Sequence, residues 1–177
     1  MDSELQYIRQ TLQGDTSAFA RLVHLHKDKV YGLALRIVRS PQDAEELAQD
    51  VFVKAFENLH KFNGSAQLAT WLFRITHNAA ISFVRKKQPP TVELNEQITT
   101  PRSSDLQKNA QEKEAQLTKL ELALTQLCGE DRSMVTLHYL NRCGVSDIAA
   151  ITGFSKSNVK VRLHRNRKKF LNLLEEI

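Results

Sequence analysis

Apolar residues recur at helical spacing in two long stretches of this chain, and the segment between them shows no such period. The first stretch begins at Thr16 and, broken by turns, reaches about residue 87; the second begins near Gln116. The intervening segment has few large apolar residues, which is typical of a linker. Only 6 Gly and 4 Pro occur among 177 residues, too few for the many turns of a sheet protein. The pattern therefore predicts an all-α fold with two small helical domains joined by a flexible linker. The expected ranges are 1–87, 88–116 and 117–177.

Capping residues predict where the first helices begin and end. Gly14-Asp15 ends a short helix and caps the next one. Ser40-Pro41 starts another helix, because serine accepts hydrogen bonds from open amide groups and proline suits the first helical position. The expected helices cover residues 3–12, 16–38, 41–59 and 67–87.

Charge is distributed unevenly along the chain. Residues 1–87 hold 12 Lys/Arg against 9 Asp/Glu, and residues 117–177 hold 10 against 6. Residues 88–116 hold 3 against 5. Two basic blocks separated by a mildly acidic segment favour a polyanionic partner that is contacted at two places.

Several classes of protein are excluded or disfavoured. The apolar runs are too short to span a bilayer, and the polar start MDSELQYIRQ is not a secretory signal, so we expect a cytoplasmic protein without membrane insertion. We find no glycine-rich phosphate loop and no nucleophile–base set, which predicts a protein that is not an enzyme and needs no cofactor. The two cysteines are expected to be free thiols. A metal site could be formed by Cys128, His138, Cys143 and His164. The spacing of these residues fits no common zinc pattern, so no metal is predicted.

Residues 144–174, GVSDIAAITGFSKSNVKVRLHRNRKKFLNLL, carry the pattern of a helix-turn-helix. Ser146 is expected to cap a short helix that ends at Gly153, and Ser155 to cap a second helix. Seven Lys/Arg and no Asp/Glu lie between Lys156 and Lys169. A charge run by itself usually indicates a solvated face, but here the glycine turn, the caps and the missing acids favour contact with DNA.

The combined pattern resembles a known family. DAEELAQDVFVKAFENLHKF (residues 43–62), followed by TWLFRITHNAAISFVRKK (70–87), resembles the second conserved region of extracytoplasmic-function sigma factors. Residues 117–174 resemble the fourth region of that family, and the order and spacing of the two regions also match. The resemblance implies a factor that binds core RNA polymerase and directs promoter-specific transcription initiation.

The resemblance also implies a polymerase-binding face on the helix that begins at residue 41. In this family that helix binds the clamp helices of the largest catalytic subunit. The matching residues here are spaced so that they share one helix face, suited to a basic partner. The matching residues are Asp43, Glu46, Gln49 and Asp50. Helix capping alone explains Asp43 but not Gln49 and Asp50.

Residues 62–87 resemble the part of the family that melts and reads the −10 promoter element. The loop is expected to take up a flipped base, with polar groups for the base and cations for the strand backbone. Trp71 could stack on a base, but its helical spacing with apolar neighbours favours a core position. The implied −10 residues are Phe62, Asn63, Gly64, Ser65, Arg74, Asn78, Arg85 and Lys86.

The second helix of the helix-turn-helix is expected to enter the major groove of the −35 element. Arginine can read base edges, while lysine mainly neutralises phosphate. The family usually has proline where this chain has Cys128, and threonine or serine where it has Asn158, which pairs best with adenine. The implied −35 residues are Ser157, Asn158, Lys160, Val161, Arg162, His164, Arg165 and Lys168.

Two other functions and two modes of control stay open from the sequence. A helix-turn-helix regulator that acts without polymerase would leave residues 43–87 unexplained, and an RNA-processing enzyme would need clustered carboxylates or a metal.

The expected partners are core RNA polymerase, promoter DNA and an anti-sigma factor, whose own membrane attachment is left open. We expect the two domains to bury little against each other, with that partner wedged between or wrapped around them. The competing interpretation is self-inhibition by direct packing of the domains.

Overall fold

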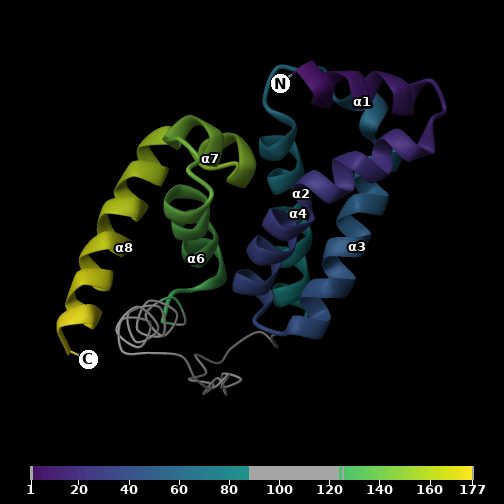
Figure 1. Ribbon diagram of the computed structural model, residues 1–177. Helices are drawn as coiled ribbons and strands as arrows, with labels where there is room; N and C mark the ends of the chain where they lie inside the picture. Colours follow the sequence, from purple (N-terminus) through teal and green to yellow (C-terminus); the bar gives the residue numbers. More distant parts are fainter. Residues whose placement is uncertain (1, 88–123, 125, 177) are drawn as a thin grey trace, which may run out of the picture.

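The structure, a computed structural model, describes residues 2–87, 124 and 126–176, and within these ranges it is helical without strands (Figure 1). The predicted all-α fold with two helical regions is confirmed. The expected linker and the start of the second region lie outside the described residues. The N-terminal domain consists of α1 (Asp2–Leu12), α2 (Thr16–Val38), α3 (Pro41–Glu57), the 3₁₀ turn η1 (Leu59–Lys61) and α4 (Leu68–Lys87). The C-terminal domain consists of α6 (Gly129–Val135), the π-helical turn η2 (Thr136–Leu140), α7 (Val145–Thr152) and α8 (Lys156–Glu176).

Most of the predicted caps are confirmed. The Asp15 carboxylate accepts hydrogen bonds from the amides of Ser17 and Ala18 at the start of α2. Ser40 Oγ accepts from the Asp43 amide, and Ser155 Oγ accepts from the Asn158 amide. The helix after Ser40 is slightly shorter than expected, because the chain tightens into η1 at Leu59.

The predicted cap at Ser146 is wrong. The residue before α7 is Gly144, whose extended backbone lets its amide donate to Asp147 Oδ2 at 3.2 Å. Ser146 already lies inside the helix and is exposed. The helix ends as predicted at Gly153, which has a left-handed φ of 78° that suits a residue without Cβ.

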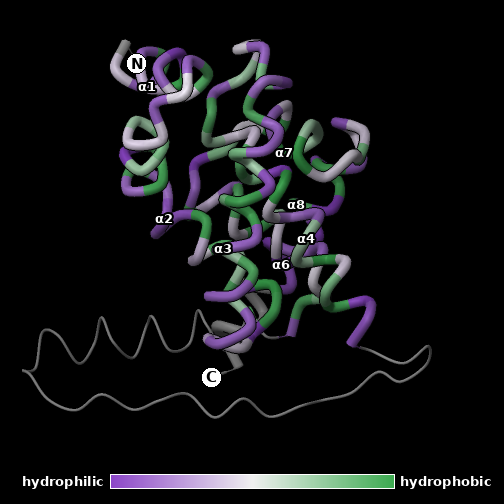
Figure 2. Tube along the Cα trace, turned by 90° about the vertical axis from the view of Figure 1, so that its right-hand side faces the viewer, coloured by the Kyte–Doolittle hydropathy of each residue, from purple (hydrophilic) through white to green (hydrophobic). Residues whose placement is uncertain are grey.

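Helix α2 forms the centre of the N-terminal domain and packs against α1, α3 and α4. Its inner face is apolar except for the buried His26, and α3 and α4 meet it mainly with buried aliphatic and aromatic side chains. In Figure 2 hydrophobic and hydrophilic segments alternate along the helices, as expected when each helix buries one stripe. The buried set includes Val30, Leu33, Ala34, Val51, Leu72 and Phe73.

The two domains pack directly on each other, so the expectation that they bury little is wrong. Helix α6 lies against α2 and α4, and α7 lies against α4. One apolar cluster runs through both domains, from Leu33 and Ile81 on one side to Met134 and Ile148 on the other. The physical reason is that α2 and α4 each have a second apolar face, which the helix-turn-helix domain covers.

Arg132 of α6 fastens this interface. Its guanidinium is buried and donates to the main-chain oxygens of Arg36 and Ile37 at the end of α2, at 3.1 and 3.4 Å. The same group donates to the oxygens of Leu124 and Leu127. Burial lowers the pKa of Arg132 to about 10, which still leaves the group charged near neutral pH. A cation at a helix C-terminus satisfies carbonyls that have no partner within the helix.

His77 of α4 makes a second buried contact across the domains. Its Nδ1 lies 2.8 Å from Ser133 Oγ of α6, and both side chains are buried. Burial lowers the pKa of His77 to about 4. The histidine is therefore neutral when the domains are packed together near neutral pH.

We expect the folded protein to lose stability as the pH falls from about 6.5 towards 4. Above the ordinary histidine pKa, His77 is neutral in both the folded and the unfolded chain, and the free energy of unfolding is at its full value. Below that pKa the unfolded chain takes up a proton on His77 that the folded protein excludes, which lowers the free energy of unfolding by up to roughly 3 kcal/mol. Urea unfolding at a series of pH values measures this slope. His77→Gln should flatten it, whereas His24→Gln, a change at an exposed position, should not. Equal slopes in all three proteins would contradict the assignment.

Candidate nucleic-acid and protein interface

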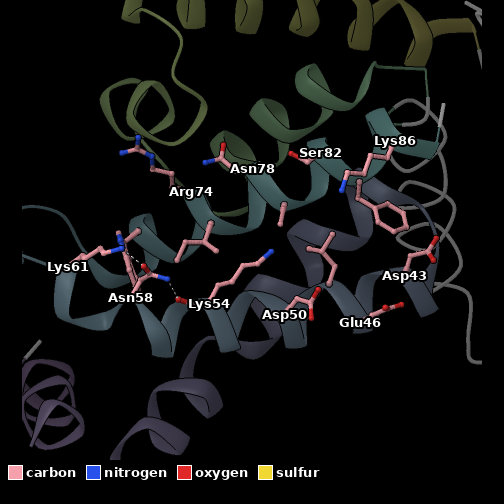
Figure 3. Close-up of a pocket in the computed structure, with 15 residues that line it drawn as sticks. Asp43, Glu46, Asp50, Lys54, Asn58, Lys61, Arg74, Asn78, Ser82 and Lys86 are labelled. Atoms are coloured by element: carbon pink, nitrogen blue, oxygen red, sulfur yellow. Dashed lines mark hydrogen bonds between the residues drawn. The ribbon is translucent and has the colours of Figure 1, made fainter. Parts of the chain in front are cut away.

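Helices α3 and α4 line an open groove with a volume of about 640 Å³ (Figure 3). Apolar side chains such as Trp71 and Ile75 line part of its surface. Polar side chains project along it from both helices. The charged and polar lining residues are Asp43, Glu46, Asp50, Lys54, Asn58, Lys61, Arg74, Asn78, Ser82 and Lys86.

The acidic side of the groove contains three of the four residues expected to bind polymerase. Glu46 and Asp50 are exposed and line the groove, while Gln49 is exposed but lies outside it. Asp43 differs from them, because its carboxylate accepts a hydrogen bond from Lys87 Nζ at 2.8 Å. This bond holds the pKa of Asp43 below its ordinary value. Glu46, Gln49 and Asp50 thus remain the residues available to a partner.

The basic side of the groove includes residues that the sequence reasoning missed. Lys61 Nζ donates to Asn58 Oδ1 at 2.7 Å, and Asn58 Nδ2 donates to the Lys54 oxygen at 2.9 Å. Lys54, Lys61 and Arg74 all line the groove, as does Asn78 of α4 (Figure 3). Helical spacing could have found them, because Lys54 and Asn58 follow Asp50 at intervals of four.

The loop after η1 is held in shape by its own side chains. Asn63 Oδ1 accepts from the amide of Ser65 at 3.0 Å and from its hydroxyl at 2.7 Å, an Asx turn. Gly64 between them has a positive φ of 72°. The side-chain oxygen Oδ1 of Asn63 is engaged in the turn. Its side-chain nitrogen Nδ2 is therefore the atom that can bind a ligand, as a hydrogen-bond donor.

Phe62 and Trp71 pair at the edge of the groove. Their ring centroids are 5.6 Å apart and the rings are tilted. Both are half-buried and pack on the apolar core, as the sequence favoured for Trp71. Trp71 also lines the groove, so one part of its ring borders the site.

Helix α8 presents most of the predicted −35 residues to solvent. Val159 and Leu163 are buried, and Val161 on the opposite side is 57% exposed. The seven exposed residues of the predicted set are Ser157, Asn158, Lys160, Val161, His164, Arg165 and Lys168.

Arg162 is the exception on α8. Its Nε donates to Asp131 Oδ1 at 2.7 Å and its Nη1 to Glu130 Oε2 at 3.2 Å. The guanidinium also lies over the ring of Phe154, 4.6 Å from its centroid. The other oxygen of Glu130 accepts from Arg85 of α4 at 2.9 Å. Two residues expected to contact DNA therefore share one carboxylate.

Cys128 and Cys143 are free thiols, as expected. Burial raises the pKa of Cys143 to about 11, and the Cys143 oxygen lies 3.1 Å from His138 Nδ1. Among the described residues no cluster of three or more His, Cys, Asp or Glu could hold a metal ion. In the same part of the chain no helix is long and apolar enough to cross a membrane.

A helix-turn-helix with an exposed basic helix, packed on a helical domain with a polar groove, defines a DNA-binding transcription protein. Residues 22–89 match the model of the Sigma-70 region 2 family, and residues 117–170 match that of Sigma-70, region 4. The RNA polymerase sigma factor YlaC of Bacillus subtilis is 32% identical over 71% of this chain and 74% of its own length. The chain belongs to the sigma factors of bacterial RNA polymerase, in the extracytoplasmic-function (ECF) group, and this family consists of transcription initiation factors.

Full-length relatives and solved structures agree. The ECF sigma factor SigW of Bacillus subtilis is 29% identical over 96% of both chains, and the sigma-H factor of Pseudomonas aeruginosa is 28% identical over 94% and 91%. CnrH, solved with the cytosolic domain of CnrY, has a TM-score of 0.72 at 23% identity over 98% of both chains. RpoE of Bartonella quintana, solved with the anti-sigma factor NepR, has a TM-score of 0.70 at 24% identity over 89% and 96%. These structures share the fold.

Proposed function

We propose that this sigma factor binds core RNA polymerase through α3, captures melted promoter DNA in the groove between α3 and α4, and reads duplex DNA with α8. The observation that carries the proposal is the groove itself, which joins exposed acids of α3 to cations and amides of α4. The N-terminal domain would span residues 1–87 and the C-terminal domain residues 117–177, with residues 88–116 connecting them.

The acidic side of the groove suits a protein partner. Glu46, Gln49 and Asp50 lie within little more than one turn of α3 and are exposed, so they can meet a basic surface without rearrangement. We assign this face to the clamp helices of the largest polymerase subunit. Asp43 stays within the protein, where Lys87 holds it.

The basic side of the groove and the adjacent loop suit single-stranded DNA. Lys54, Lys61 and Arg74 can neutralise phosphates, and Asn78 offers both a donor and an acceptor to a base edge. The loop Asn63–Ser65 is shaped in advance by its Asx turn, which reduces the entropy lost when a flipped base enters. Arg85 and Lys86 extend the positive charge along α4.

The exposed face of α8 suits the major groove of duplex DNA. Lys160 and Lys168 can neutralise phosphates, while Asn158 and Arg165 have the geometry to read base edges. We assign Arg162 a structural role instead, because Asp131 and Glu130 already bind its guanidinium.

The protein would act by binding and not by catalysis, in the cytoplasm where core RNA polymerase works. An anti-sigma factor is the expected regulator, since RpoE of Bartonella quintana was solved with one. Because the two domains already contact each other, a partner that wraps around both fits better than one wedged between them.

Run-off transcription tests the proposal. Core polymerase with this chain is expected to produce transcripts from discrete start sites on pooled genomic fragments, whereas core polymerase alone should not. Sequencing the transcript ends gives the positions of the recognised elements. Duplex binding without any polymerase-dependent transcript would favour the helix-turn-helix regulator instead.

A further inference from the structure

Val161 is an apolar side chain in the middle of the polar face of α8. It is 57% exposed, whereas Val159 and Leu163, on the opposite side of the helix, are buried in the core. Single exposed apolar residues are common on protein surfaces and by themselves need no explanation. What distinguishes Val161 is its position among the polar residues around it.

Polar residues flank Val161 on both sides. Asn158 and Arg165, three residues before it and four after, lie on one side of the helix. Ser157 and His164, four residues before it and three after, lie on the other side. All four of these side chains are exposed. A partner that binds this face of α8 therefore has Val161 at the centre of the contact.

A valine at this position gains little from the protein itself. Position 161 lies inside α8 and away from its ends. Because β-branched side chains lose rotamer freedom in a helix, valine is a poorer helix former than alanine or a long polar residue. The side chain also stays largely exposed, so burial does not compensate for this loss. Its apolar surface is available to a partner.

The surroundings of Val161 indicate that this partner is duplex DNA. Residues 156–169 contain seven Lys/Arg and no Asp/Glu, which suits a polyanion. Helix α8 follows the turn at Gly153, and the N-terminal part of the second helix of a helix-turn-helix meets base edges in the major groove. The helix packs on α6 and α7 at the outer edge of the molecule (Figure 1). Its exposed face is therefore open to a duplex.

Thymine is the base whose edge suits an apolar side chain. In the major groove guanine, adenine and cytosine present hydrogen-bond donors and acceptors, while thymine presents one acceptor and its 5-methyl group. A valine placed on a polar edge would displace water without replacing its hydrogen bonds. Asn158, one turn before Val161, pairs best with adenine, whose partner in the duplex is thymine. An A·T base pair thus offers a suitable group to each of these two neighbouring side chains.

We propose that Val161 is a specificity-determining residue of α8, which reads a thymine of the −35 element by packing against its 5-methyl group. This inference rests on the proposed function, because it uses the binding of α8 to that element. The contact is between methyl groups and involves no charge or hydrogen bond. It adds a preference for thymine to the reading of base edges by Asn158 and Arg165.

Deoxyuridine tests the contact, because it differs from thymidine only by the missing 5-methyl group. Core polymerase that carries the full-length chain is bound to promoter fragments recovered by run-off transcription, and each thymine of the −35 element is replaced singly. We expect at least one replacement to weaken promoter binding roughly fourfold, the value of one buried methyl group. An element without thymine, or one in which every replacement binds as well as the parent DNA, overturns the proposal.

Val161→Ala tests whether Val161 makes the contact. The position is exposed and alanine favours a helix, so the variant should fold. It should bind the thymine promoter roughly fourfold more weakly than the parent protein does, and removal of the thymine methyl should then cost it little. Val53→Ala is the matched control, because Val53 of α3 is also 57% exposed. That variant should retain the parental ratio of thymine to deoxyuridine binding.

The outcomes separate this inference from the proposed function. A preference for thymine that survives in Val161→Ala overturns the role of Val161, because another side chain must then contact the methyl group. Promoter-specific complexes without any preference for thymine also contradict the inference alone. Absence of every promoter-specific complex contradicts the proposed function, and the inference fails with it.

Discussion

An Asn78→Ala variant is expected to form open complexes roughly tenfold to hundredfold less well than the parent, the loss that follows from removing one good set of base contacts. Asn78 is exposed and lines the groove beside Arg74, so the substitution removes a donor and an acceptor without disturbing the core. Permanganate footprinting of the melted strand measures the effect. Binding of duplex DNA by the C-terminal domain should be unchanged.

Asn158→Ala is the matched control, because it makes the same chemical change on α8. It should weaken duplex binding and leave capture of a premelted promoter bubble intact. Asn63→Ala is a less clean test, since it also removes the acceptor of the two Ser65 hydrogen bonds and loosens the loop. Unchanged melting in Asn78→Ala would refute the assignment of the groove to the melted strand.

Reversing the charge of Asp50 is expected to weaken binding to core polymerase at least roughly tenfold, because like charges facing each other across an interface cost several kcal/mol. Asp50 is exposed and makes no ion pair in the described part of the chain, so Asp50→Lys should fold as the parent does. Titration of labelled protein with core polymerase gives the affinity. Thermal unfolding of the free variant checks the fold.

Asp28→Lys supplies the control on a different helix. Asp28 lies on α2, is exposed and does not line the groove. The two variants have the same net charge, so a general loss of electrostatic attraction would affect both equally. A parental affinity in Asp50→Lys would remove α3 from the polymerase interface.

Local signals in the sequence were sufficient to predict the helices of the N-terminal domain and the two helices of the helix-turn-helix, but not α6 as a separate short helix. Asp15, Ser40, Gly153 and Ser155 mark helix ends through bonds to amides within three residues, or through their own backbone conformation. The cap at Gly144 shows the limit of this reasoning, since the capping oxygen comes from Asp147 inside the helix. The exposed face of α8 was also predictable, because helical spacing alone separates Val159 and Leu163 from the polar side.

The sequence by itself determined that this chain forms two sets of amphipathic helices, the second with a basic helix-turn-helix. Only the tertiary structure decided that these sets pack together, that α3 and α4 line an open groove, and that Arg162 is bound by acids of α6. Helical periodicity identifies an apolar face but not the surface that covers it. His77 and Ser133 are 56 residues apart, and Arg132 and Arg36 are 96 apart. Contacts at such separations depend on the shape and polarity of whole faces, which no local pattern encodes.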